Sequence, residues 1–406
     1  MMPSKSSIHI SRKQSPSFRR EDDACQPLSP LSLISRRIAK MLAVFTFLSL
    51  LSLCYSFRFP FERRGDHVGQ AGGTGSAGGF PGPHITGLAI HDPSIIKVGG
   101  SYYAYGVGPH INIFQSPSLD GPWQQVGTVL DGPSIIKKGD NTAPWAPTVI
   151  QHGDTFYCYY SVSQAGCRDS AIGVATSKKP GPGGWVDHGL VLQTGNGEGG
   201  NVHPFDKSNA IDPYVFIDGN QGYLTFGSYW TGIWQVPLAP DLISVLNPEH
   251  PDATNLAYEP KPLDSGGANP NPLCRDETGS HPVEGATMSF RDGWYYLWYS
   301  HGRCCELDPN ALPAPEDLYN IRVGRSRSPR GPFVDRNGVD LVNGGGTIVY
   351  ASNGPVIAPG GQGILTDGDT DILYYHYLDN RKGLGFWDAQ MGYSPLKYEN
   401  GWPVAV

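Results

Sequence analysis

Short apolar or alternating runs, separated by turn residues, dominate the chain after residue 84. The apolar run at 94–98 is followed by Gly99 and Gly100 and then by the alternating aromatic run at 102–106. Alternation with a period of two predicts a half-buried β-strand, and a Gly pair between two such runs predicts a hairpin. No ten-residue stretch after residue 60 has a convincing helical stripe. The pattern therefore predicts an all-β domain.

This hairpin pattern recurs along the chain, and each time a third strand-like run follows and ends in a Ser, Pro or Gly turn. The units begin near residues 92, 147, 212, 284 and 355. Their spacing of ~55 to ~70 residues matches one four-stranded propeller blade with its loops. A β-sandwich also has many short strands, but it does not repeat one strand order five times. We therefore predict a five-bladed β-propeller over residues 84–406.

Three segments of different composition precede this domain. Residues 1–40 are polar and basic, and residues 41–57 form an uncharged apolar run directly after Arg36, Arg37 and Lys40. A basic flank before an apolar run is typical of a secretory signal peptide, and its length is also near the lower limit for a membrane-spanning signal anchor. Residues 58–83 predict a Gly-rich linker. We expect a secreted protein, or one anchored through residues 41–57 with the domain outside the cell.

Charge and aromatic content narrow the expected partners. The net charge of −7 argues against nucleic acid, which requires a basic face. Aromatic residues make up 11% of the chain, and their rings can stack on the C–H faces of sugars. The composition thus favours a neutral polysaccharide as the partner, with no nucleic acid and with membrane contact only through residues 41–57.

Five cysteines fall within the predicted domain, and their spacing does not suggest a zinc site. Cys158, in the middle of a predicted strand, is expected to be a buried thiol or a partner of Cys167. In an oxidising compartment Cys274 could pair with Cys304 or Cys305. The sequence leaves the disulfide connectivity open.

Three of the five units carry an acid at the start of the first strand: Asp92, Asp212 and Glu284. The first strands of propeller blades line one central channel, so these acids are expected to meet at one pore mouth. Crowded carboxylates raise some pKa values and leave other groups ionised. Glycoside hydrolysis needs this division between a protonated acid and a carboxylate base. An isolated Asp-Pro pair more often only opens a turn, but three acids in phase with the repeat favour a catalytic site.

Several motifs carry a family resemblance over roughly residues 84–406. They are HDPS (91–94), WAP (145–147), NAIDP (209–213), GSYWTGI (227–233), GWPV (401–404) and a Glu that begins the fourth unit. Together they resemble the arabinan-degrading members of glycoside hydrolase family 43, of a fungal type. The resemblance implies a propeller that hydrolyses α-1,5-linked arabinan with inversion in a single displacement. It implies Asp92 as the general base and Glu284 as the general acid. Asp212 would orient the acid and adjust its pKa.

The resemblance also suggests how the substrate is held. Trp145, Tyr229 and Trp230 are candidate sugar platforms, and Asn209 and Ser228 are candidate partners for sugar hydroxyls. Trp145 could equally pack between blades, and Asn209 could cap a turn. The segment 227–233 resembles endo-acting members, so we expect cleavage within plant cell-wall arabinan or pectin side chains. We also expect a monomer, although this segment does not bear on the oligomeric state.

One family feature is missing from the last unit. Family members often have a GPGH segment whose His holds a hydrated metal ion near the pore, but Gly361 stands at that His position. We therefore expect no required cofactor, and a pore calcium ion is doubtful. His91 and His376 remain as polar candidates at the pore, although a lone His more often has a structural role.

Other functions fit parts of the same pattern. An exo-acting α-L-arabinofuranosidase or β-xylosidase of the same family would differ only in how loops close the pore. Fructan-cleaving propellers carry an Arg-Asp-Pro motif, whereas Arg291-Asp292 is followed here by Gly293. A non-catalytic glycan-binding propeller would not require all three acids.

Overall fold

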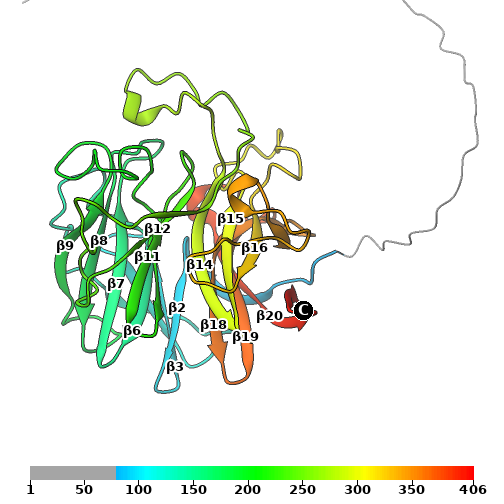
Figure 1. Cartoon of the computed structure of the whole chain (residues 1–406). Coiled ribbons are helices and arrows are strands. Elements are labelled where there is room, and N and C mark those ends of the chain that lie inside the picture. The colour runs from blue at the N-terminus through cyan, green and yellow to red at the C-terminus, as the bar shows by residue number, and fades with distance from the viewer. Residues whose placement is uncertain (1–78) are drawn as a thin grey trace, which may run out of the picture. The chain divides into compact units, whose positions relative to one another are not determined.

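Nearly all regular structure in residues 79–406, the part of the chain that the computed structural model describes, is β-strand (Figure 1). The helical exceptions among these residues are the 3₁₀ turns η1 (Pro272–Cys274), η2 (Leu341–Asn343) and η3 (Phe386–Asp388). The predictions for residues 1–40, 41–57 and 58–78 lie outside the described residues. Over residues 79–406, no helix combines the length and apolarity needed to cross a membrane.

The strands form five antiparallel sheets, and each is one blade of the predicted propeller. In the first two blades, from the innermost strand outward, the strands are β2 (Ser94–Val98), β3 (Ser101–Gly106), β4 (Asn112–Ser116) and β5 (Gln124–Thr128), then β6 (Trp145–His152), β7 (Thr155–Val162), β8 (Ala171–Ser177) and β9 (Val186–Gln193). The third and fourth blades are β10 (Tyr214–Asp218), β11 (Gln221–Phe226), β12 (Ile233–Pro237) and β13 (Thr254–Ala257), then β14 (Val283–Arg291), β15 (Trp294–His301), β16 (Asn320–Ser326) and β17 (Thr347–Tyr350).

Both ends of the described chain meet in the fifth blade. Its inner strands are β18 (Val356–Asp367), β19 (Thr370–Asp379) and β20 (Gln390–Glu399), and its outer strand is β1 (His84–Ala89), which pairs with β20. The final strand, β21 (Trp402–Ala405), pairs with β20 as well. The N-terminal strand therefore completes the last blade and links the two ends of the ring, an arrangement that the repeat pattern did not predict.

The innermost strands contact one another in cyclic order: β2, β6, β10, β14, β18 and again β2. Between neighbouring blades, the alternating side chains of facing strands pack into separate apolar clusters, because each sheet must bury both of its faces. One such cluster lies at each of the five blade interfaces, represented by Tyr105 with Phe156, Tyr159 with Leu224, Ile233 with Leu297, Trp298 with Tyr375, and Tyr374 with Ile95.

Candidate active site

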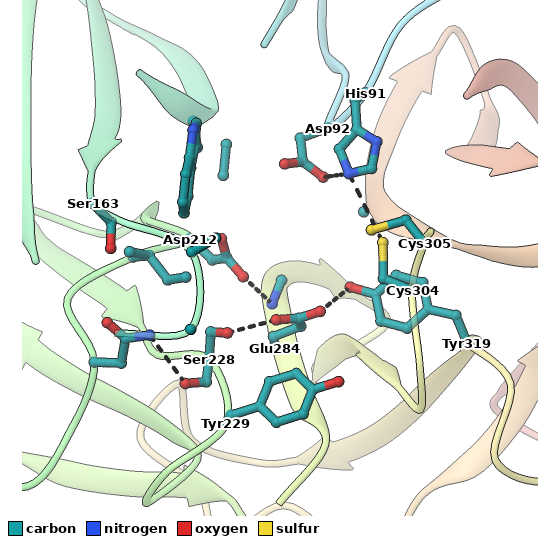
Figure 2. Close-up of a pocket in the computed structure, with 18 of the residues that line it drawn as sticks. His91, Asp92, Ser163, Asp212, Ser228, Tyr229, Glu284, Cys304, Cys305 and Tyr319 are labelled. Atoms are coloured by element: carbon teal, nitrogen blue, oxygen red, sulfur yellow. Dashed lines mark hydrogen bonds and ion pairs between the residues drawn. The ribbon is translucent and has the colours of Figure 1, made fainter. Parts of the chain in front are cut away.

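A cavity of about 760 Å³ opens at the pore end where the first strands of the blades begin (Figure 2). This volume lies in the upper part of the ~300–1,000 Å³ range of small-molecule sites, so more than one sugar ring fits. The cavity wall contains all eight side chains that the sequence proposed: Asp92, Trp145, Asn209, Asp212, Ser228, Tyr229, Trp230 and Glu284. Residues more than a hundred positions apart in sequence thus share one pocket.

A left-handed backbone residue lies near the start of the innermost strand in the first four blades, and inside β18 in the fifth. Asp92 has φ 48°, Ala146 42°, Asp212 56°, Gly285 61° and Gly361 54°. The left-handed conformation strains a residue that has a Cβ, and such strain is concentrated at functional sites. Asp tolerates it better than most residues because its short side chain can bond locally. This shared turn gives the acids of the first and third blades equivalent positions.

Glu284 lies one residue before the position that Asp92 and Asp212 occupy in their blades. In the fourth blade Gly285 takes the left-handed position, and the β14–β15 register shifts between Glu284 and Thr287. A β-bulge of this kind redirects side chains next to it. The sequence suggested that the three acids were equivalent, but the bulge gives Glu284 its own direction into the pocket.

The carboxylate of Glu284 lies between two hydroxyl donors (Figure 2). Ser228 Oγ donates to Glu284 Oε2 at 2.5 Å, and Tyr319 Oη donates to Glu284 Oε1 at 2.8 Å. Burial raises the pKa of Glu284, and the nearby Asp92 charge raises it further, while the two hydrogen bonds oppose the rise. The net pKa stays above the ordinary value, so this carboxyl is suited to carry a proton.

Asp212 holds the backbone beside Glu284. Its Oδ2 accepts a hydrogen bond from the Gly285 N–H at 3.0 Å, and its own N–H donates to Ser161 Oγ at 3.0 Å. Burial raises the pKa of Asp212 well above its usual range, and the charges of Glu284 and Asp92 act in the same direction. Asp212 is therefore suited to orient Glu284 through the strand on which Glu284 lies.

Asp92 faces two imidazole rings. His91 Nε2 lies 3.6 Å from Asp92 Oδ1, and His376 Nδ1 lies 3.4 Å from the same oxygen. Burial would raise the pKa of Asp92, but His91 and His376 lower it below its ordinary value through charge and hydrogen bonding. The pocket thus pushes the pKa values of Asp92 and Glu284 in opposite directions, as an acid–base pair requires.

The candidate substrate-binding residues differ in whether their side chains are available to bind a sugar. Asn209 is buried, and its side chain accepts from Ser170 Oγ at 2.7 Å and donates to the Ser228 carbonyl at 3.4 Å. Since the Ser228 hydroxyl bonds Glu284, both polar groups are engaged within the protein. Trp145, Tyr229 and Trp230 are half-buried at the pocket wall.

Sequence reasoning missed three further residues of the pocket. Tyr319, at the end of a loop before β16, bonds the acid, and no motif marks it. Trp387 in η3 lines the cavity with 68% of its surface exposed, and an exposed Trp is an available sugar platform. Thr287 Oγ1 is buried at the wall and has no hydrogen-bond partner in the described part of the chain. The isolated aromatic pair Phe386-Trp387 in a Gly-rich loop was the one signal in the sequence.

The cysteines pair differently from the sequence suggestions. Cys167 forms a disulfide with Cys274, so neither Cys158–Cys167 nor a bond from Cys274 to Cys304 or Cys305 is present. The sequence could not show this pairing, because the long loop that carries Cys274 folds back over the second blade. The bond ties η1 to the β7–β8 loop, and both segments contribute to the cavity wall.

The surroundings of Gly361 suit calcium poorly. A Cβ at this position would lie 2.5 Å from His376 Nδ1 and 2.8 Å from Asp92 Oδ1, so no side chain fits. The neighbouring donors are two imidazoles, one carboxylate and the thiol of Cys304. Calcium takes six to eight oxygen ligands, so this set of donors does not fit it. That no cofactor is required stays a prediction.

Comparisons with known proteins agree with this geometry. The sequence profile of Glycosyl hydrolases family 43 matches residues 83–403. The chain is 57% identical over 326 residues, 80% of this chain and 91% of the relative, to the Probable arabinan endo-1,5-alpha-L-arabinosidase B of Aspergillus flavus. It is 56% identical over 346 residues, 82% of this chain and 86% of the relative, to the Arabinan endo-1,5-alpha-L-arabinosidase B of Emericella nidulans.

Two solved structures with a similar fold are also arabinanases. The alpha-L-arabinanase of Cellvibrio cellulosa complexed with arabinohexaose matches with a TM-score of 0.66 and 26% identity, covering 79% of this chain and 96% of that one. The GH43 endo-arabinanase from Bacillus licheniformis matches with a TM-score of 0.60 and 29% identity, covering 80% and 99%. The five-bladed fold with its acid-lined pocket, the profile match and these relatives together show that the chain belongs to glycosyl hydrolases family 43.

Proposed function

We propose that this chain is an endo-acting arabinanase that hydrolyses internal α-1,5-L-arabinofuranosidic bonds. The main support for the proposal is that one cavity shifts the pKa values of two carboxyls in opposite directions. The pKa of Glu284 is raised and that of Asp92 is lowered. The names of the fungal relatives support arabinan over xylan or fructan as the substrate. The alternatives are an exo-acting enzyme, the activity named for one similar solved structure at 25% identity, and a non-catalytic glycan-binding propeller. The fungal relatives named for endo action share more than twice that sequence identity with this chain.

The reaction uses the two carboxyls on opposite sides of one bond. Glu284 donates its proton to the departing glycosidic oxygen, and Asp92 takes a proton from the water that attacks the anomeric carbon. Asp212 keeps β14 in place through the Gly285 N–H and thereby orients Glu284. His91 and His376 favour the ionised form of Asp92, which the base needs before water is activated.

Sizing of the early products tests endo action. Incubation with debranched arabinan is expected to give oligosaccharides of many lengths before arabinose accumulates, because an endo-acting enzyme cleaves the chain at interior positions. Release of only arabinose or one short product from the beginning would contradict endo cleavage and favour the exo-acting alternative. Turnover of aryl xyloside but not of arabinan would contradict the substrate.

Tyr319→Phe is expected to move the alkaline limb of the pH–rate profile to higher pH. The Tyr319 hydroxyl stabilises the ionised form of Glu284, so its removal raises the pKa of Glu284 further. The acid then keeps its proton at higher pH. Measurement of kcat against pH for both proteins checks this, and Tyr258→Phe, outside the cavity wall, is the matched control. A limb that moves to lower pH would contradict the role of this hydrogen bond.

Trp387→Ala is expected to raise KM for debranched arabinan several-fold with little change in kcat. The ring is exposed at the cavity wall, and stacking on a sugar ring is worth about 1 kcal/mol. Steady-state kinetics on polymer and on arabinotriose separate the effects. The matched control is Phe290→Ala, an exposed aromatic residue outside the cavity. An unchanged KM would remove Trp387 from the binding surface.

The proposal extends to the location of the enzyme. A signal peptide or signal anchor at residues 41–57 would deliver the catalytic domain outside the cell, where arabinan of plant cell walls occurs. Sequencing of the N-terminus of the protein recovered from culture medium tests this, and a protein retained inside the cell would contradict it.

A further inference from the structure

Two adjacent thiols at the cavity wall have no part in the proposed hydrolysis. Cys304 and Cys305 lie in the loop after β15, partly exposed and with no disulfide partner among residues 79–406 (Figure 2). Cys304 Sγ lies 3.9 Å from His91 Nε2 and also 3.9 Å from His376 Nε2. One donor atom from each of His91, Cys304 and Cys305 lies within 4.8 Å of the other two.

These separations are close to those around a tetrahedral metal ion. With bonds of about 2.3 Å to sulfur and about 2.0 Å to nitrogen, a tetrahedral site separates the two donors by about 3.5 Å. The observed 3.9 Å between Cys304 Sγ and His91 Nε2 needs only a small approach of the side chains. No rearrangement of the strands is required to bring the three donors onto one ion.

The ring of His91 is already oriented as a metal ligand. Its Nδ1 lies 3.1 Å from the Phe386 carbonyl oxygen. In the neutral ring, the form that binds a metal, this contact places the proton on Nδ1 and leaves the Nε2 lone pair towards the thiols. Metal-bound histidines commonly have such a carbonyl partner for the second nitrogen. Stacking on the Phe386 ring, with centroids 3.8 Å apart, fixes the orientation further.

We propose that Cys304, Cys305 and His91 form a binding site for a thiophilic divalent cation such as Zn²⁺, and that its occupation inhibits hydrolysis. Two thiolates and one imidazole are a known zinc ligand set with a fourth position left open, whereas calcium and magnesium prefer oxygen. On binding, each thiol releases its proton to solvent and its sulfur binds the metal.

Inhibition follows from the position of the site. His91 Nε2 is also 3.6 Å from Asp92 Oδ1, so a cation held there lies next to the carboxylate that activates water. The cation's charge stabilises the carboxylate and draws it towards the metal, which makes Asp92 a poorer base. A higher concentration of thiophilic metal ions therefore lowers the activity of the enzyme.

A Zn²⁺ titration of the purified protein by calorimetry, with activity measured in parallel, tests the proposal. The wild type is expected to bind one ion with loss of activity. In the Cys304→Ser, Cys305→Ser double variant, Kd and the inhibition constant should both rise at least about 100-fold, because loss of ligands exceeds the 10–100-fold effect of losing their outer partners. Cys158→Ala, at a buried thiol within the second blade, is the control and should bind as the wild type does. Equal binding by the double variant would overturn the proposal.

A second measurement needs neither a variant nor hydrolysis, so it stays decisive if the double variant does not fold or the proposed function fails. Iodoacetamide labelling of the wild type, followed by peptide mapping, gives the alkylation rate of Cys304 and Cys305. Zn²⁺ is expected to slow that rate at least tenfold, and Mg²⁺ should leave it unchanged. The same rate with and without Zn²⁺ would overturn the proposal.

Discussion

Replacement of Glu284 by Gln is expected to lower kcat on debranched arabinan by about 10²–10⁴-fold, the usual contribution of general acid catalysis. Gln has the same shape; its carbonyl oxygen can accept from one of the two hydroxyls of Ser228 and Tyr319, and its amide N–H can donate to the other. Substrate binding should therefore persist. The leaving oxygen of unactivated arabinan cannot depart without a proton, whereas an aryl leaving group can. We therefore expect a much smaller loss of kcat on an aryl arabinotrioside.

The comparison of the two substrates makes the Glu284 prediction specific. Glu249→Gln, at an exposed carboxylate outside the cavity, is the matched control and should behave as the wild type. Equal losses on the polymer and on the aryl substrate would show damage to the pocket instead of loss of an acid. Retained hydrolysis of arabinan would reject Glu284 as the acid.

Asp92→Asn is the second large effect that we expect, with kcat lowered about 10²–10⁴-fold and arabino-oligosaccharide binding retained. Asn tolerates the left-handed backbone at position 92, where φ is 48°, so the turn should survive. The loss arises because an amide cannot take the proton from water. Unlike the acid variant, Asp92→Asn should lose similar activity on the polymer and on the aryl substrate.

Binding and turnover together decide between an enzyme and a glycan-binding propeller. Calorimetry with an arabino-oligosaccharide measures binding, and Asp131→Asn, at an exposed carboxylate away from the cavity, is the control. A wild-type protein that binds the oligosaccharide but turns over no arabinan would favour the non-catalytic alternative. Loss of binding in Asp92→Asn would assign this carboxylate to the substrate site alone.

The fold could be predicted to the level of the blade, because the three inner strands of each unit combine alternation with Gly or Asp turns. The outer strand of each blade was harder to predict from the sequence. Strand β13 follows β12 only after a long loop, and β1 precedes the first unit although it belongs to the last blade. Outer strands are short and partly exposed, so their pattern is weak, and pairing between the chain ends leaves no local signal.

The acids of the site could be predicted because they recur in phase with the repeat, but their surroundings could not. Tyr319 reaches Glu284 from the end of the β15–β16 loop, which is longer than the corresponding loops of the other blades. The bulge that places Gly285, and not Glu284, at the left-handed position depends on strand register, which the sequence does not specify by itself. Both features lie within the fourth blade and depend on how its strands pair and how its loop folds, for which the repeat pattern carries no signal.

The anomeric configuration of the first product tests the central claim, that Asp92 activates a water while Glu284 protonates the departing oxygen of the same bond. Proton NMR of arabino-oligosaccharide hydrolysis, recorded before mutarotation, should show the β-anomer appearing first at the new reducing end, because the water attacks from the face opposite the leaving group. Initial release of the α-anomer would mean retention through a covalent intermediate, and it would contradict the account.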